Sequence, residues 1–274
     1  MTPKASTTSA QIVDRLTPRT FAIANQKGGV GKTTTAINLG TALAAIDKRV
    51  LIVDLDPQGN ATTGLGVERD AGRHDVYDVL IGNAGLAEAV VDTMVPNLRI
   101  IPAGVDLSGA EIELVNLERR EFFLRKALRQ NATNYDFILI DCPPALGLLT
   151  INALVAAAAV LVPLQCEFFA LEGISHLMRT VERVKKTLNP RLEIQGIVLT
   201  MFDKRNNLST LVADDVRAYF KDKVYETMIP RNVRISEAPS HGRPVVIYDV
   251  NCAGARAYLH LANEVLRRER GLVA

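Results

Sequence analysis

The sequence predicts an α/β protein with a doubly wound, mostly parallel β-sheet flanked by helices. Several apolar runs of strand length are nearly continuous, which is typical of parallel strands buried on both faces. Segments with apolar residues at helical spacing lie between these runs, and this alternation indicates a doubly wound sheet. With 274 residues, of which 48% are hydrophobic and 23% charged, the chain is long enough to bury a large core in one domain.

The first strand, loop and helix are predicted at residues 21–24, 25–34 and 35–46. The first range is the apolar run FAIA, and the third is rich in Ala and Leu with apolar residues at helical spacing. The glycine-rich sequence NQKGGVGKTT joins them. A phosphate belongs at such a loop, because the following helix points its positive end at the same place.

The residue types in this loop suit phosphate binding. Gly28, Gly29 and Gly31 allow the backbone to adopt positive φ and turn successive N–H groups inward. Lys32 supplies a cation for the β and γ phosphates, and Thr33 supplies the hydroxyl that such loops place on Mg²⁺. The sequence therefore predicts a site for a nucleoside triphosphate and magnesium.

The loop departs from the usual phosphate-loop formula at its start. Gln26 stands where the formula has its first glycine, and Lys27 adds a second lysine although Lys32 already serves the phosphates. This K-G-G-x-G-K-T-T sequence is the deviant Walker A pattern. The alternative is a glycine-rich turn with incidental lysines, and the strand-loop-helix context favours the phosphate site.

Two further predicted strands end in carboxylates. The strand at 49–54 leads into Asp54 and Asp56, and the strand at 135–141 ends in Asp141. Ligands of open parallel sheets bind beyond the carboxyl ends of the strands, so these side chains are expected near the phosphate loop. A hydrophobic strand ending in Asp has the form of a Walker B element, whose carboxylate holds the magnesium shell. A polar turn is the alternative for Asp54 and Asp56.

The rest of the chain continues the alternation. Residues 58–66, rich in Gly and Thr, are predicted to be a mobile loop beside the γ-phosphate. The Ser/Thr/Pro-rich residues 1–18 are predicted to be a flexible tail, and 19–274 a single domain. The further elements expected are strands at 98–102, 156–163 and 193–200 and helices at 106–130, 171–188 and 208–220.

Charge and cysteine usage narrow the class of protein. The formal net charge is +2, but residues 200–274 hold 12 Lys and Arg against 9 Asp and Glu, so a polyanion site is sought there. Cys142, Cys166 and Cys252 are scattered, which argues against disulfides, structural zinc and an iron–sulfur site. The N-terminus lacks the apolar core of a signal peptide, and we expect a cytoplasmic protein.

Five motifs occur in order along the chain, at residues 27–34 (KGGVGKTT), 54–60 (DLDPQGN), 137–144 (FILIDCPP), 201–205 (MFDKR) and 229–240 (IPRNVRISEAPS). With them the chain resembles the ParA/Soj family of bacterial DNA-partitioning ATPases, which have the deviant Walker A loop. The resemblance extends from residue 21 to about 268 and leaves out the N-terminal tail.

The resemblance implies a role for each site residue. Lys32 would bind the phosphates, and Lys27 would reach across a homodimer to the partner's nucleotide. Asp56 would orient the attacking water, and Thr33 and, through water, Asp141 would hold Mg²⁺. The nucleotide-binding set would be completed by Gly28, Gly29, Val30, Gly31, Thr34, Pro230 and Arg231, the last two beside adenine.

The resemblance also implies a function. ATP would be the substrate and would also stabilise the dimer. Intrinsic hydrolysis would be weak until a ParB-like centromere-binding protein stimulates it. The ATP dimer would bind double-stranded DNA without sequence preference through Arg205 and Arg234, which places the protein on the nucleoid. Residues 204–234 hold seven Lys and Arg against four Asp and Glu, and a solvated charged face is the alternative interpretation of that cluster.

The main alternative function is a MinD-like membrane-cycling ATPase, which shares the loop and the dimer. Such a protein ends in a membrane-binding amphipathic helix. The segment 258–274 lacks Trp and Phe, and Tyr258, Leu261 and Val265 fit docking of this helix onto the sheet, so we expect no membrane binding. A metabolic kinase or electron-transfer protein is a third class, and the scattered cysteines disfavour its iron–sulfur members.

Overall fold

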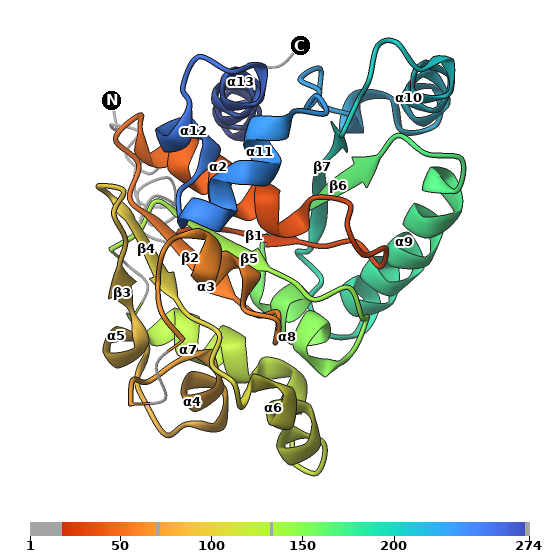
Figure 1. Ribbon diagram of the computed structural model, residues 1–274. Helices are drawn as coiled ribbons and strands as arrows, with labels where there is room; N and C mark the ends of the chain where they lie inside the picture. Colours follow the sequence, from red (N-terminus) through yellow and green to blue (C-terminus); the bar gives the residue numbers. More distant parts are fainter. Residues whose placement is uncertain (1–17, 70–71, 132–133, 272–274) are drawn as a thin grey trace, which may run out of the picture.

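The computed structural model describes residues 18–69, 72–131 and 134–271, and the predicted tail at 1–18 lies almost wholly outside them. A seven-stranded sheet forms the centre, in the order β3-β4-β2-β5-β1-β6-β7 (Figure 1). All neighbours pair in parallel except β3, which runs antiparallel to β4. The predicted doubly wound α/β fold is therefore confirmed. The strands are β1 (Arg19–Ile23), β2 (Val50–Asp54), β3 (Val91–Asp92), β4 (Leu98–Ile101), β5 (Phe137–Asp141), β6 (Ala159–Gln165) and β7 (Glu193–Thr200).

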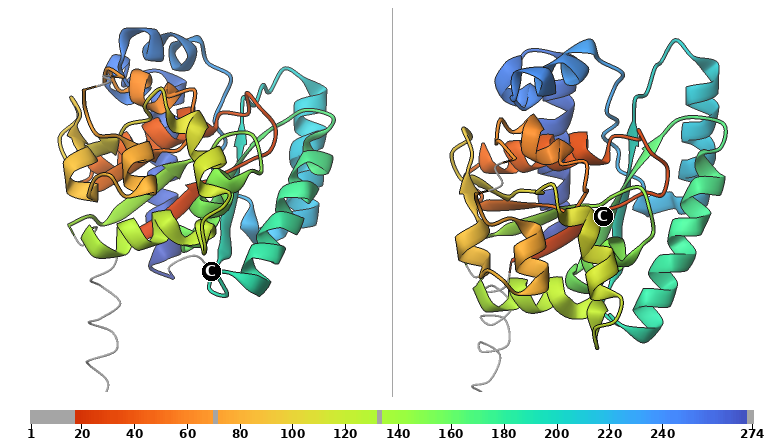
Figure 2. Two further views of the ribbon diagram at one scale, coloured as in Figure 1. Left: turned by 90° about the horizontal axis from the view of Figure 1, so that it is seen from below. Right: turned by 60° about the horizontal axis from the view of Figure 1, so that its bottom comes forward.

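Helices cover both faces of the sheet, as the two turned views in Figure 2 show. One face packs against α2, α3 and the C-terminal helices, and the other against α4 to α10. The helices are α2 (Lys32–Ala44), α3 (Asn60–Gly64), α4 (Val76–Ile81), α5 (Leu86–Ala89), α6 (Leu107–Leu114), α7 (Phe123–Asn131), α8 (Leu148–Ala156), α9 (Ala170–Thr187), α10 (Asn207–Phe220), α11 (Val233–Glu237), α12 (Val245–Tyr248) and α13 (Ala253–Glu269), with 3₁₀ turns at Arg120–Phe122, Lys221–Lys223 and Ala238–His241.

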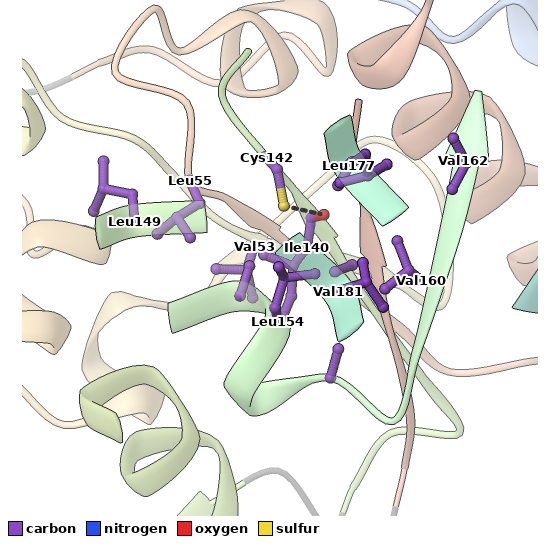
Figure 3. Close-up of a cluster of buried hydrophobic side chains, with 14 of the residues drawn as sticks. Val53, Leu55, Ile140, Cys142, Leu149, Leu154, Val160, Val162, Leu177 and Val181 are labelled. Carbon is purple, nitrogen blue, oxygen red and sulfur yellow. Dashed lines mark hydrogen bonds between the residues drawn. The ribbon is translucent and has the colours of Figure 1, made fainter. Parts of the chain in front are cut away.

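Two buried hydrophobic clusters hold these layers together. In the cluster drawn in Figure 3, Val53 and Ile140 from adjacent strands pack with Leu154 of α8 and with Leu177 and Val181 of α9. Every residue of β2 and β5 is buried, because helices lie on both sides of them. Central parallel strands therefore need near-continuous apolar sequence, which is the signal by which they were predicted.

The predicted helix at 106–130 is wrong in its extent. The structure divides it into α6 and α7, separated by turns and a 3₁₀ turn, with Arg119 in the left-handed region at φ 55°. Helix α6 packs against α4, whereas α7 packs mainly against α8 and also contacts α4. Tertiary packing overrides continuous helical propensity in the segment 106–130.

Helix α8, which was not predicted, ends at Ala156, so β6 begins at Ala159 and not at residue 156.

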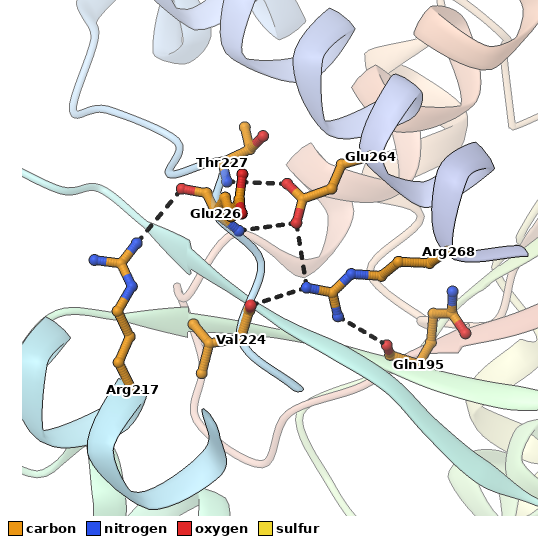
Figure 4. Close-up of polar contacts among 7 residues, drawn as sticks. All are labelled: Gln195, Arg217, Val224, Glu226, Thr227, Glu264 and Arg268. Carbon is orange, nitrogen blue, oxygen red and sulfur yellow. Dashed lines mark hydrogen bonds and ion pairs between the residues drawn. The ribbon is translucent and has the colours of Figure 1, made fainter. Parts of the chain in front are cut away.

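A buried ion pair attaches α13 to the chain beyond β7 (Figure 4). Glu264, whose side chain is 4% exposed, accepts hydrogen bonds from the backbone N–H groups of Glu226 at 2.8 Å and Thr227 at 3.0 Å, and pairs with Arg268 at 3.2 Å. Arg268 also donates to the Val224 carbonyl at 2.9 Å. This network holds the segment 224–230 alongside β7, where Pro230 bridges Phe202.

Replacing Glu264 with Gln is expected to lower the free energy of unfolding by about 2–4 kcal/mol, because Arg268 and two backbone donors lose a buried anion. Urea unfolding measures this loss, and the slope of the free energy of unfolding against urea concentration is expected to stay unchanged. Glu182→Gln removes an exposed carboxylate from α9 and is the matched control. Equal midpoints for the two variants would show that the network does not stabilise the fold.

Candidate nucleotide-binding site

The phosphate loop joins β1 to the start of α2. Gly29 and Gly31 have φ of 73° and 88°, in the left-handed region that glycine adopts without strain. Gly28 is not among the residues with positive φ, so that part of the prediction is wrong. Gly31 caps α2 without any side-chain hydrogen bond to the first turn. The first N–H groups of α2 and its positive dipole end are thus directed at the loop, which suits an anion.

Lys32 begins α2 and is only 6% exposed. Its Nζ donates to the Lys27 carbonyl at 3.1 Å, across the loop. Burial lowers the pKa of Lys32, and the charges of Asp141, Cys142 and Asp56 oppose that shift in decreasing order. A phosphate placed here would stabilise the buried ammonium, because an opposite charge favours the protonated form.

Asp141 and Asp54 lie side by side at the ends of β5 and β2, whose register pairs them. Both are fully buried. Burial is the main cause that raises the pKa of Asp54 to about 6, against hydrogen bonds from Thr62 and Asp56. Burial and then the charge of Asp54 raise the pKa of Asp141 well above its usual value, and the nearby Thr33 hydroxyl opposes this. Two buried carboxylates this close favour a cation between or beside them.

The two carboxylates differ in their hydrogen bonds. Asp54 Oδ2 accepts from the Thr62 N–H at 2.8 Å and the Thr62 hydroxyl at 2.6 Å, and the same hydroxyl accepts from the Ala103 N–H at 2.9 Å. Asp54 therefore ties β2 to α3 and to the residues after β4. Residues 60–64 of the predicted mobile loop are this short helix, which is a correction. The sequence offered no signal that Thr62 is the partner of Asp54.

Within the described chain, neither oxygen of the Asp141 carboxylate accepts a hydrogen bond of good geometry. A buried polar atom without a partner needs an explanation, and an ion is one. Hard cations such as Mg²⁺ prefer oxygen ligands, and Thr33 contributes a hydroxyl close by. The residues present therefore fit a magnesium ion, which the Thr33 hydroxyl and the Asp141 carboxylate would hold.

Asp56 follows β2 and is 7% exposed. Its Oδ1 accepts from the Gln58 N–H at 3.0 Å, and its own N–H donates to Asp54 Oδ1 at 3.3 Å. The charge of Asp56 acts on the pKa values of both Lys32 and Asp141, so the three groups share one site. This arrangement brings together the phosphate-binding, magnesium and water-orienting candidates at the carboxyl ends of β1, β2 and β5.

The side chain of Lys27 contacts a carboxylate of the same chain. Its Nζ is 2.6 Å from Oε2 of Glu167, and the two side chains are 39% and 46% exposed. Glu167 lies between β6 and α9 and was not predicted as a site residue. The ion pair joins residues 140 positions apart, so no local pattern in the sequence could indicate it.

The two predicted DNA-binding arginines differ in their surroundings. Arg205 is 88% exposed, pairs with Asp203 at 2.9 Å, and lines an open cleft of ≈ 930 Å³ together with Pro230 and Arg231. Arg205 lowers the pKa of Asp203 to about 2. Arg234 is not among the residues lining this cleft, and pairs instead with Glu237 at 2.9 Å.

Helix α13 forms the other wall of the cleft. Its exposed polar residues there are Arg256, His260, Asn263 and Arg267, spaced at four, three and four positions, which places them on one helix face. Sequence reasoning missed Arg256 and Arg267, although helical spacing of polar residues in the basic C-terminal quarter is a usable signal. Tyr258, Leu261 and Val265 are buried on the opposite side of α13, which packs on α2, with the Tyr258 hydroxyl 3.4 Å from that of Thr35.

The chain is similar to several known proteins. A family model described as an AAA domain matches residues 18–194. The chromosome partitioning protein ParA of Caulobacter vibrioides is 64% identical over 254 residues, covering 92% of this chain and 95% of that protein. The sporulation initiation inhibitor protein Soj of Bacillus subtilis is 57% identical over 245 residues, covering 89% and 97%.

A solved structure also resembles the chain closely. It is a cobyrinic acid a,c-diamide synthase from Mycobacterium smegmatis with a bound ATP analogue and magnesium. The two chains superpose with a TM-score of 0.81 at 39% identity, over 92% of this chain and 96% of the other. Separately, none of the helices within residues 18–69, 72–131 and 134–271 is long and apolar enough to span a bilayer.

Proposed function

The chain belongs to the ParA/Soj family of chromosome-partitioning ATPases, and from this premise we propose how it works. It binds ATP and Mg²⁺, forms an ATP-bound homodimer that holds DNA without sequence preference, and leaves the DNA after hydrolysis. A ParB-like protein stimulates a weak intrinsic ATPase activity. The observation that carries the ATP site is buried Lys32 beside the buried carboxylate of Asp141, which accepts no hydrogen bond of good geometry within the described chain.

Each residue of the site has one task in this proposal. The N–H groups of the loop from Gly28 to Thr34 and the Lys32 ammonium bind the phosphates. Thr33 and Asp141 hold the magnesium ion, which supplies charge neutralisation when bound. Asp56 orients the attacking water, and its place beside Lys32 and Asp141 supports this. Pro230 and Arg231 border the adenine.

Lys27 supplies a cation to the nucleotide of the opposing subunit. Lys32 already occupies the centre of its own loop, and Lys27 lies at the partly exposed edge. Two triphosphates between two subunits bring anionic charge that cations supplied in trans offset. ATP then stabilises the dimer, because a ligand that binds one state better shifts the equilibrium toward it.

The DNA contacts come from Arg205 and Arg234, and the cleft beside Arg205 supports a wider surface. Apart from Arg231, which borders the adenine, four Lys and Arg line that cleft against two Asp and Glu, namely Lys204, Arg205, Arg256 and Arg267 against Asp203 and Glu226. Phosphate contacts of this kind carry no sequence information. Binding through them places the protein in the cytoplasm on the nucleoid.

The MinD-like alternative is disfavoured by the position of α13. A membrane-binding helix must expose its apolar face, whereas the apolar residues of α13 are buried in the domain. The exposed face carries Arg256, His260, Asn263 and Arg267, without large apolar residues.

Replacing both Arg205 and Arg234 with Ala is expected to abolish nonspecific DNA binding at physiological salt. In a symmetric dimer four phosphate contacts are lost, which flattens the slope of log affinity against log salt by about three to four. The measurement is binding of the ATP dimer to duplexes of unrelated sequence over a range of salt concentrations. Arg179→Ala/Arg183→Ala removes the same charge from exposed sites on α9 and is the control. An unchanged slope in an intact ATP dimer would place the DNA surface elsewhere.

A further inference from the structure

The short segment between β6 and α9 contacts the phosphate loop through Glu167. Lys27 Nζ lies 2.6 Å from Glu167 Oε2. The second carboxylate oxygen of Glu167 accepts a hydrogen bond from the side chain of Gln165, at the end of β6. Gln165 thus holds the Glu167 carboxylate in place, and the Lys27 side chain is directed toward Glu167 of the same chain.

The backbone of Lys27 is tied to the same strand. The Lys27 N–H donates to Asn25 Oδ1 at 3.1 Å, and the buried Asn25 side chain donates to the Pro163 carbonyl in β6 at 2.7 Å. The Lys27 carbonyl accepts from Lys32 Nζ. Since Asn25 anchors the Lys27 backbone to β6, the Lys27 ammonium can leave Glu167 by rotation of its side chain.

We propose that Glu167 competes with the nucleotide of the opposing subunit for Lys27, so that this ion pair must break when the ATP-bound dimer forms. The proposal rests on the role in trans of Lys27 given above. An ammonium that contacts a triphosphate across the dimer cannot keep its 2.6 Å contact with a carboxylate on its own subunit. Glu167 is in this view a positioning residue that biases the protein toward the monomer.

The expected strength of the Lys27–Glu167 ion pair is consistent with a small bias toward the monomer. Both side chains are partly exposed, at 39% and 46%, so water screens the interaction. An exposed ion pair of this kind changes an equilibrium by about fivefold at most. A symmetric dimer breaks two pairs, and their removal is therefore expected to tighten the dimer by about two- to thirtyfold. A triphosphate can overcome a bias of this size.

The test is the variant Glu167→Gln, which keeps the size of the side chain and removes its charge. Sedimentation with a nonhydrolysable ATP analogue and Mg²⁺ measures the dissociation constant of the dimer. It is expected to fall by about two- to thirtyfold relative to wild type. The affinity of the monomer for the same analogue, measured at protein concentrations where sedimentation shows monomer, is expected to stay the same.

Two further variants separate the explanations. Glu172→Gln makes the same charge change at an exposed position of α9 and should leave the dimer constant unchanged. Lys27→Ala is expected to bind the analogue and fail to dimerise. A Glu167→Gln dimer that is weaker than or equal to wild type, or a gain matched by tighter binding of the analogue to the monomer, overturns the inference. Wild-type dimerisation by Lys27→Ala overturns the role in trans itself.

Discussion

Lys32→Ala is expected to weaken ATP binding by about 10²- to 10³-fold, or about 3–4 kcal/mol. The ammonium is buried at the start of α2 and held by the Lys27 carbonyl, so it is already in place when the phosphates arrive. Its removal also leaves the carboxylates of Asp56 and Asp141 without the cation that faces them. Calorimetric titration with ATP and Mg²⁺ measures the loss, and the ATP-dependent dimer should disappear with it.

Lys186→Ala, which removes an exposed lysine from α9, is the control and should bind ATP as the wild type does. The folded state is checked by thermal unfolding, because a buried lysine contributes packing as well as charge. If Lys32→Ala kept wild-type affinity while folded, the assignment of the phosphate loop would be wrong. This outcome is distinct from a loss of dimerisation alone, which concerns Lys27.

Asp56→Ala is expected to reduce ATP hydrolysis by about 10²- to 10³-fold while leaving ATP binding intact. A residue that orients water acts on the chemical step, and the Asp56 carboxylate lies beside Lys32 and Asp141 after the end of β2. The ATP-bound dimer should therefore accumulate. Single-turnover hydrolysis and light scattering of the same sample measure the two effects together.

Asp54→Asn separates a catalytic loss from a structural one. Asp54 binds Thr62 through its N–H and hydroxyl, so its replacement is expected to lower stability more than Asp56→Ala does. Asp222→Ala, at an exposed position, controls for loss of charge. Wild-type hydrolysis by Asp56→Ala, or loss of its ATP binding, would remove Asp56 from the water-orienting role.

The sequence alone was sufficient for the fold class and the phosphate loop, because both depend on local patterns. Buried parallel strands need continuous apolar runs, and these are visible at 49–54 and 135–141. The loop needs glycines and a lysine at fixed spacing directly before a helix, and residues 25–34 have them. The same motifs identified the family, which the 64% identity to a ParA protein confirms.

Asp54 and Asp56 show what local sequence patterns do not predict. Asp54 and Asp56 have the same residue type, two positions apart, at the end of one strand, and no sequence pattern distinguishes their partners. Both lie near Asp141, but Asp54 accepts hydrogen bonds from Thr62 in α3, whereas the charge of Asp56 acts on Lys32. Side chains alternate about a strand but not beyond its end, so the turn after β2 decides which groups meet.

Long-range contacts were decided only by the tertiary structure. The sequence determined that a second lysine opens the phosphate loop, and that basic residues gather in the last quarter of the chain. Packing determined that Lys27 meets Glu167, and that Arg205 shares a cleft with Arg267 and not with Arg234. An ion pair between groups 140 residues apart depends on strand order and helix packing, which join segments that no local spacing relates.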